Sequence, residues 1–248
     1  MSKPPVFAMK TGGFVISGNN DAISKMLYIF ETLCCENGPL SKSSTNWNRL
    51  FCESVNMYGL WSDEIDKIIK GISEATQNIG AYRKAPNRNP DMLTELGDDL
   101  RAVCCFWTGS TYVGSPKSDP IKMAFQAFFE ELMQLLLFMK DSALPFEKRV
   151  ANAMLYRGTV YRYLGKNYPS DEVVVPYYDG IYVSWSKQDG NNYLLSKLYG
   201  PVTRITCEIA EPVYGIDLDI LECTRGNEQE VVFPTFEKCI MEINFLNK

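Results

Sequence analysis

The chain has 248 residues, enough to bury a large core, and 46 % of them are hydrophobic and 22 % charged, as in ordinary globular proteins. A net charge of −5 without a basic stripe argues against direct nucleic-acid binding. The chain contains no histidine, which excludes Ser-His-Asp and Cys-His catalysis and histidine-containing metal sites. Its chemistry must therefore use carboxylates, hydroxyls, thiols, amines and bound small molecules.

Apolar residues at helical spacing predict four helices in the first half of the chain. Between the second and third, the polar, proline-bearing residues 82–90 are expected to connect subdomains. The fourth helix opens at Asp119-Pro120, a cap followed by proline at the first helical position. The apolar stripes run from Ile23 to Cys34, Ile65 to Ile72, Leu93 to Val103, and Ile121 to Leu136.

From residue 156 onward, short apolar runs separated by Gly, Pro, Asn and Asp predict strands. Helices followed by strands favour an α+β fold over alternating βαβ units. The sequence contains neither Gly-x-Gly-x-x-Gly nor the P-loop motif. The expected strands run from Val173 to Pro176, Tyr178 to Ser186, Val202 to Glu208, Val213 to Ile220, Glu230 to Phe233, and Cys239 to Phe245.

The eight cysteines do not follow the spacing of a disulfide framework or of a zinc site. We therefore expect free thiols in a reducing compartment and no metal. The run from Leu132 to Met139 is too short to span a bilayer, and the first residues do not resemble a signal peptide. These features predict a soluble protein that is made in a cytoplasm.

Three polar positions in the β half are candidates for chemistry. Glu228 and Glu230 lie two residues apart at the start of a predicted strand, so that both side chains can face one ligand. Arg157, before Gly158, can bind a phosphate or brace a carboxylate. Ser184 and the serine two residues after it share one strand face. Taken singly, each position also fits a structural role as an edge charge, an ion pair or an exposed polar face.

Together, the order of these motifs and the residues around them resemble the R-S-E class of mono-ADP-ribosyltransferases, of the arginine-specific type found in bacterial toxins and effectors. Tyr156-Arg157-Gly158 is similar to the family's Y-R-G, and the stretch from Tyr182 to Ser186 is similar to its aromatic-x-Ser-Thr-Ser. The stretch from Thr108 to Tyr112 is similar to its YTGSxY helix end. The resemblance covers roughly residues 92–246. Trp185 departs from the usual Thr, and Thr235 from a frequent proline.

The resemblance implies that NAD⁺ is a substrate whose nicotinamide–ribose bond breaks through an oxocarbenium-like transition state. Glu230 would stabilise the positive charge on the ribose, and Ser184 would orient Glu230. Arg157 and Gly158 would hold the NAD⁺ phosphates or brace the site. Glu228 would position the acceptor, most simply an arginine side chain.

The remaining NAD⁺ contacts implied by the resemblance come from Ser186 and from aromatic residues. Residues 187–200 would form a loop that closes over NAD⁺, in which Tyr193, or alternatively Tyr199, would stack on nicotinamide. Tyr112 would line the adenosine side.

The fold implied is α+β, with an N-terminal helical region followed by the mixed or antiparallel two-sheet β core of these enzymes. Residues 1–90 would serve delivery or target recognition, and residues 91–248 would form the catalytic domain, packed with the first part as one globular monomer. The expected partners are NAD⁺ and a protein acceptor, and the expected setting is a bacterial toxin or effector delivered into a host cell. Two alternatives stay open: an NAD⁺ glycohydrolase on the same site, and a catalytically inactive interaction module.

Overall fold

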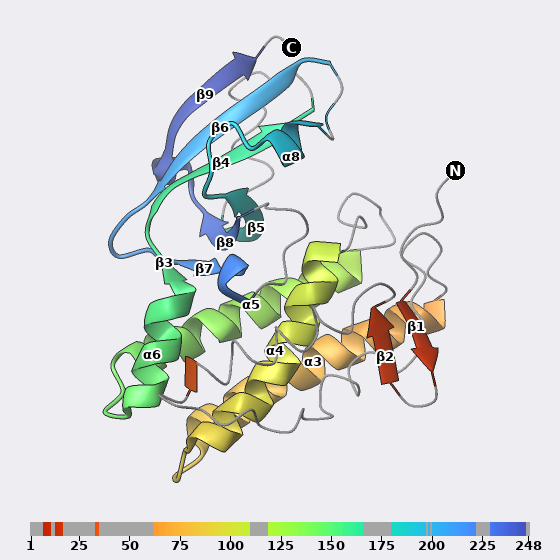
Figure 1. Ribbon diagram of the computed structural model, residues 1–248, viewed down its shortest axis with the longest axis vertical. Coiled ribbons are helices and arrows are strands. Elements are labelled where there is room, and N and C mark those ends of the chain that lie inside the picture. Colours follow the sequence, from red (N-terminus) through yellow and green to blue (C-terminus); the bar gives the residue numbers. More distant parts are fainter. Residues whose placement is uncertain are drawn as a thin grey trace. The chain divides into compact units, whose positions relative to one another are not determined.

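The computed structural model describes residues 7–10, 13–16, 33–34, 62–109, 119–165, 180–196, 198, 200–221 and 229–246. The chain divides into two compact units (Figure 1). The first comprises residues 1–152 with 221–223, and the second comprises residues 153–220 with 224–248. The α+β class expected from the sequence is confirmed.

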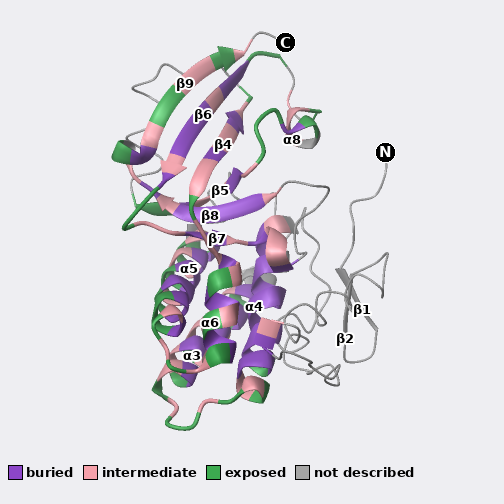
Figure 2. Ribbon diagram, turned by 60° about the vertical axis from the view of Figure 1, so that its left-hand side comes forward, coloured by how far each residue is buried: buried purple, intermediate pink, exposed green. Residues whose placement is uncertain are grey.

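The first unit is built on helices that pack through apolar stripes. Its helices are α3 (Ser62–Lys84), α4 (Pro90–Gly109), α5 (Asp119–Lys140) and α6 (Pro145–Met154), and residues Phe7–Lys10 (β1) and Gly13–Ile16 (β2) form a hairpin. On α3 the buried positions Ile68, Ile72, Ala75 and Ile79 recur at helical spacing, which places them on one face (Figure 2). No helix in the described parts of the chain is long and apolar enough to cross a membrane.

The start of α4 shows why the chain turns at residues 85–89. The side chain of Asn89 accepts a hydrogen bond from the backbone N–H of Met92 at 2.9 Å, and Pro90 occupies the first helical position. The sequence predicted that this stretch joins two subdomains. It is instead a short link between α3 and α4 inside the first unit, because the two helices pack together through their apolar faces.

The second unit contains a seven-stranded sheet in which every neighbouring pair is antiparallel. The strand order is β3-β7-β8-β5-β4-β6-β9, so strands distant in sequence lie side by side (Figure 1). The strands are β3 (Leu155–Tyr156), β4 (Gly158–Leu164), β5 (Ile181–Ser186), β6 (Val202–Ile209), β7 (Gly215–Asp217), β8 (Glu230–Thr235) and β9 (Ile240–Leu246). A short helix, α8 (Asn192–Ser196), follows β5.

The centre of this sheet is a narrow junction. β4 and β5 are joined by the single pair Tyr161↔Ser186, whereas β5 and β8 pair from Ile181 to Ser186 along the whole of β5. The seven strands therefore form one sheet, but its two halves, β3-β7-β8-β5 and β4-β6-β9, are joined by one residue pair. The structure thus has one seven-stranded sheet where a two-sheet core was expected, because the pair Tyr161↔Ser186 joins its two halves.

The core under the sheet explains why a tryptophan stands at position 185, where the sequence motif led us to expect a threonine. Trp185 is buried with Val160, Ile205, Val231 and Phe233, and its ring centroid lies 5.5 Å from that of Phe233. Its indole N–H donates a hydrogen bond to Thr235 at 3.1 Å, which satisfies the polar atom of a buried ring. Trp185 and Thr235, the two positions at which the sequence departs from the motifs that it resembles, therefore contact each other.

Most predicted elements agree with the structure, but three elements were not predicted. The sequence analysis missed α6, although its buried positions Phe146, Val150, Ala151 and Met154 recur at helical spacing. It also missed β4 as a strand, and it treated the segment holding α8 as an open loop. The compact units divide near residue 152, whereas the predicted catalytic domain starts at residue 91. The predicted first helix and the strand from Val173 to Pro176 lie almost wholly outside the described residues.

Candidate functional site

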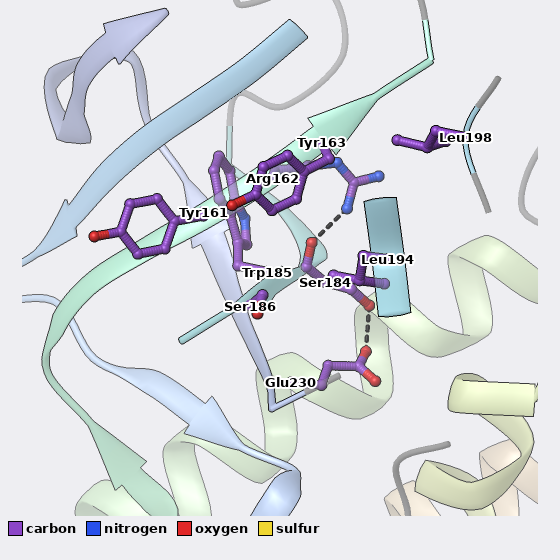
Figure 3. A pocket seen from close by; sticks show the side chains of 9 residues that line it. All are labelled: Tyr161, Arg162, Tyr163, Ser184, Trp185, Ser186, Leu194, Leu198 and Glu230. Carbon is purple, nitrogen blue, oxygen red and sulfur yellow. Dashed lines mark hydrogen bonds between the residues drawn. The ribbon is translucent and has the colours of Figure 1, made fainter. Parts of the chain in front are cut away.

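Glu230 and Ser184 meet on neighbouring strands. In the antiparallel pairing of β5 with β8, Glu230 lies opposite Ser186, and Ser184 lies opposite Val232. The Ser184 hydroxyl donates a hydrogen bond diagonally across the pair to Oε1 of Glu230 (Figure 3). Glu230 is only 3 % exposed. The structure therefore brings together two of the three positions named by the R-S-E pattern and gives the buried carboxylate a fixed direction.

A pocket of about 200 Å³ lies over this pair in the second unit (Figure 3). Its walls come from β4, β5, α8 and the start of β8, and they are mainly aromatic and aliphatic. It is lined by Tyr161, Arg162, Tyr163, Ser184, Trp185, Ser186, Leu194, Leu198 and Glu230. An apolar pocket with a few convergent polar groups is the usual form of a small-molecule site.

Arg162 is a pocket residue that the sequence analysis missed. It lies on β4, and its guanidinium donates a hydrogen bond to the backbone carbonyl oxygen of Ser184 (Figure 3). Ser184 thus contacts a cation through its carbonyl and an anion, Glu230, through its hydroxyl. The signal in the sequence was an arginine between Tyr161 and Tyr163. An arginine within a strand can face a binding pocket as well as solvent.

Ser186 has a different role from Ser184. It is 1 % exposed, and its hydroxyl accepts hydrogen bonds from the backbone N–H of Gln188 at 3.1 Å and from the Asn191 side chain at 3.4 Å. The same hydroxyl donates to the backbone carbonyl of Gln188 at 3.2 Å. Ser186 therefore lines the pocket but shapes the turn after β5.

That turn leads into the helix that closes one side of the pocket. Asn191 caps α8, because its side-chain oxygen accepts the N–H of Leu194 at 3.1 Å. Tyr163 holds the turn: its hydroxyl donates to Asp189 at 3.0 Å and accepts the N–H of Gly190 at 2.6 Å. Burial and the Asp189 carboxylate raise the pKa of Tyr163 to about 12. The turn is thus tied to β4 through a neutral phenol.

An ion cluster fixes the chain where it enters β8. The ammonium of Lys187 contacts Asp217 at 2.9 Å and Asp219 at 3.3 Å, and its backbone N–H donates to the carbonyl of Gln229 at 2.9 Å. Gln229 has a φ of 48°, in the left-handed region. Burial lowers the pKa of Lys187, but the two carboxylates outweigh it, and the net pKa is raised. Burial raises the pKa of Asp217 in spite of the lysine.

Arg157 and Gly158 are not among the residues that line the described pocket. Arg157 lies in the break between β3 and β4, where its guanidinium is 3.9 Å from the ring centre of Tyr214 and 3.4 Å from the Glu211 carboxylate. Gly158 has a φ of 140°, and a Cβ there would lie 2.9 Å from the hydroxyl of Tyr156. The local structure thus explains both residues without a ligand, and their predicted contact with NAD⁺ stays untested.

The remaining predicted site residues are described in part or not at all. Glu228 and Tyr112 lie outside the described residues, as does Tyr199. The backbone of Tyr193 belongs to α8, but its side chain is not described. Among the residues that are described, no group of three or more carboxylates, thiols or imidazoles is placed to hold a metal ion.

Comparisons of the chain with protein-family models, with curated proteins and with solved structures each find no match. A functional assignment must therefore be argued from the residues and geometry of the pocket.

Proposed function

We propose that the protein is a mono-ADP-ribosyltransferase that takes NAD⁺ as its substrate and transfers ADP-ribose to a protein side chain, most simply an arginine. The observation that carries the proposal is the hydrogen bond from Ser184 to the buried carboxylate of Glu230, at the base of a pocket. These are the serine and the glutamate that the sequence resemblance pairs. They are 46 positions apart, and the hydrogen bond between them is the contact that the expected orienting role of Ser184 needs.

The pocket suits a reaction that develops positive charge on a sugar. When the bond between C1′ of the ribose and the nicotinamide nitrogen breaks, the bonding electrons leave with nicotinamide and C1′ becomes cationic. Glu230 would stabilise that charge, and because the carboxylate is already oriented by Ser184 it needs little rearrangement. The aromatic rings of Tyr161, Tyr163 and Trp185 lower the local polarity, which strengthens the attraction.

The transfer is completed when a nucleophilic nitrogen of the acceptor bonds to C1′ and gives up a proton. In the sequence, Glu228 precedes Glu230 by two residues, and a carboxylate suits a guanidinium acceptor as a bidentate partner. Glu228 would orient the acceptor and help remove the proton. If water replaced the protein acceptor, the same site would act as an NAD⁺ glycohydrolase.

The sheet is consistent with this proposal. Glu230 is the first residue of β8, and Ser184 lies on the adjacent β5. Both lie next to the pair Tyr161↔Ser186, which joins the two halves of the sheet. We propose that the second compact unit carries the core of an ADP-ribosyltransferase fold, with the NAD⁺ site at this junction.

The test is incubation of the full-length protein with labelled NAD⁺ and a host-cell lysate, beside Glu230→Ala and Glu228→Ala. We expect a labelled protein band that disappears in both variants and carries ADP-ribose on arginine by mass spectrometry. Nicotinamide release without a labelled band, lost only in Glu230→Ala, would indicate hydrolysis instead. No consumption of NAD⁺ by the wild-type protein, with or without lysate, would contradict the proposal.

A further inference from the structure

We propose that Arg162, and not Arg157, is the phosphate-binding arginine of this site, and that it binds the phosphate on the nicotinamide ribose. The inference rests on the proposed function, since it names a further contact of the same substrate. Arg162 projects into the pocket from β4, whereas Arg157 does not line it.

The positions of the two arginines separate their roles. Arg157 lies over the ring of Tyr214 and beside the carboxylate of Glu211, which is 80 % exposed. Those contacts are of the kind that fixes a surface arginine. Arg162 lines the pocket, where its guanidinium donates to the carbonyl of Ser184, and the planar fork of a guanidinium suits phosphate oxygens.

The positions of the charged groups in the pocket match the nicotinamide half of NAD⁺. Arg162 lies on one side of Ser184 and Glu230 on the other (Figure 3). A matching ligand carries a positive charge and a phosphate a short distance apart. The nicotinamide ribose has this arrangement, with the cationic ring on C1′ near Glu230 and the phosphate on the 5′ carbon toward Arg162.

The size of the pocket also favours the phosphate on the nicotinamide ribose as the group that Arg162 binds. Its volume of about 200 Å³ is below the roughly 300–1,000 Å³ of typical small-molecule sites. It is therefore too small for a complete dinucleotide, and at most one half of NAD⁺ can lie in it. The phosphate nearest to the reacting carbon is the one that this pocket can reach.

The test compares two ligands that differ by that phosphate. Isothermal titration calorimetry measures the binding of nicotinamide mononucleotide and of nicotinamide riboside to the full-length wild type, Arg162→Gln, Arg162→Lys and Arg157→Gln. Arg83→Gln serves as a matched control, because Arg83 is a partly exposed arginine that pairs with Glu131 in the first unit. Thermal unfolding of each variant establishes that it is folded.

We expect Arg162→Gln to weaken mononucleotide binding by about 10- to 100-fold, the loss of a charged hydrogen bond, and to leave riboside binding within about 2-fold. Arg162→Lys keeps the charge but loses the fork, and should lie between the wild type and the glutamine variant. A purely structural role, acting through Ser184, would weaken both ligands equally, so the ratio of the two dissociation constants separates the roles.

Equal losses for the two ligands would overturn the inference, as would a phosphate-dependent loss in Arg157→Gln and not in Arg162→Gln. Failure of the wild type to bind the mononucleotide would overturn it too. If the wild type binds the mononucleotide through Arg162 but never consumes NAD⁺, the inference stands and the proposed transfer reaction fails.

Discussion

The most direct prediction concerns the hydroxyl of Ser184. Ser184→Ala removes the hydrogen bond to Glu230 and leaves the strand pairing of β5 with β8 intact, because the backbone is unchanged. A hydrogen bond to a charged group contributes about 1.5–3 kcal/mol. Since Glu230 is 3 % exposed, water cannot readily replace the lost donor, and the effect should fall in the upper part of that range.

If this energy orients the carboxylate for the transition state, the rate of nicotinamide release should fall by about 50- to 150-fold. The assay is the initial rate of nicotinamide release from NAD⁺ at saturating NAD⁺, followed by chromatography. Because the hydroxyl contacts Glu230, we expect the loss mainly in kcat, with a smaller change in KM.

The matched control is Thr159→Val. Thr159 lies on β4 and does not line the pocket, and its hydroxyl donates to the carboxylate of Glu208 on β6 at 2.8 Å. Both variants remove a hydroxyl-to-carboxylate bond within one sheet, and both should lower the free energy of unfolding by about 1.5–3 kcal/mol. Only Ser184→Ala should slow the reaction. A Ser184→Ala protein that keeps more than half the wild-type rate, or a Thr159→Val protein that loses as much, would refute the reasoning.

Three further predictions concern stability and pH. Gly158→Ala should lower the free energy of unfolding by about 1–3 kcal/mol in urea titrations, because a φ of 140° is strained for alanine; an unchanged midpoint would contradict this. Lys187→Met should destabilise by about 2 kcal/mol, since it leaves the mostly buried carboxylate of Asp217 without its cation, and Lys187→Arg should recover part of the loss. Burial and Asp189 raise the pKa of Tyr163 to about 12, so its neutral form stabilises the fold fully below about pH 10, and the contribution is lost as pH rises toward 12. Unfolding measured between pH 9 and about 12 should therefore be less pH-dependent in Tyr163→Phe than in the wild type, and equal slopes would be inconsistent with this.

The candidate site could be predicted only in part. The sequence named Ser184 and Glu230 because a serine strand and a Glu-x-Glu stretch are local patterns, and the structure joins them by a hydrogen bond. The choice of arginine could not be made in the same way. Arg157 carries the motif, whereas the residue in the pocket is Arg162, and the direction of each side chain depends on the break between β3 and β4.

The role of the second serine shows the same limit. Ser184 and Ser186 share a strand face, and the strand alternation by itself does not distinguish them. Ser186 lies opposite Glu230 in the register, yet its hydroxyl turns to Gln188 and Asn191, while the diagonal neighbour Ser184 bonds the carboxylate. The difference arises from the turn after β5, which offers backbone partners only to the serine at the strand end.

By itself the sequence determined the α+β class, the three long helices α3, α4 and α5, and the absence of histidine chemistry. These follow from apolar period, capping residues and composition, which act over a few residues or over the whole chain without regard to contacts. Only the tertiary structure decided the strand order β3-β7-β8-β5-β4-β6-β9, the joint at Tyr161 and Ser186, and the placement of Arg162 and Glu230 on either side of Ser184. Those features depend on the register between strands far apart in the chain, and many registers satisfy the same local alternation until the core around Trp185 and Phe233 is packed.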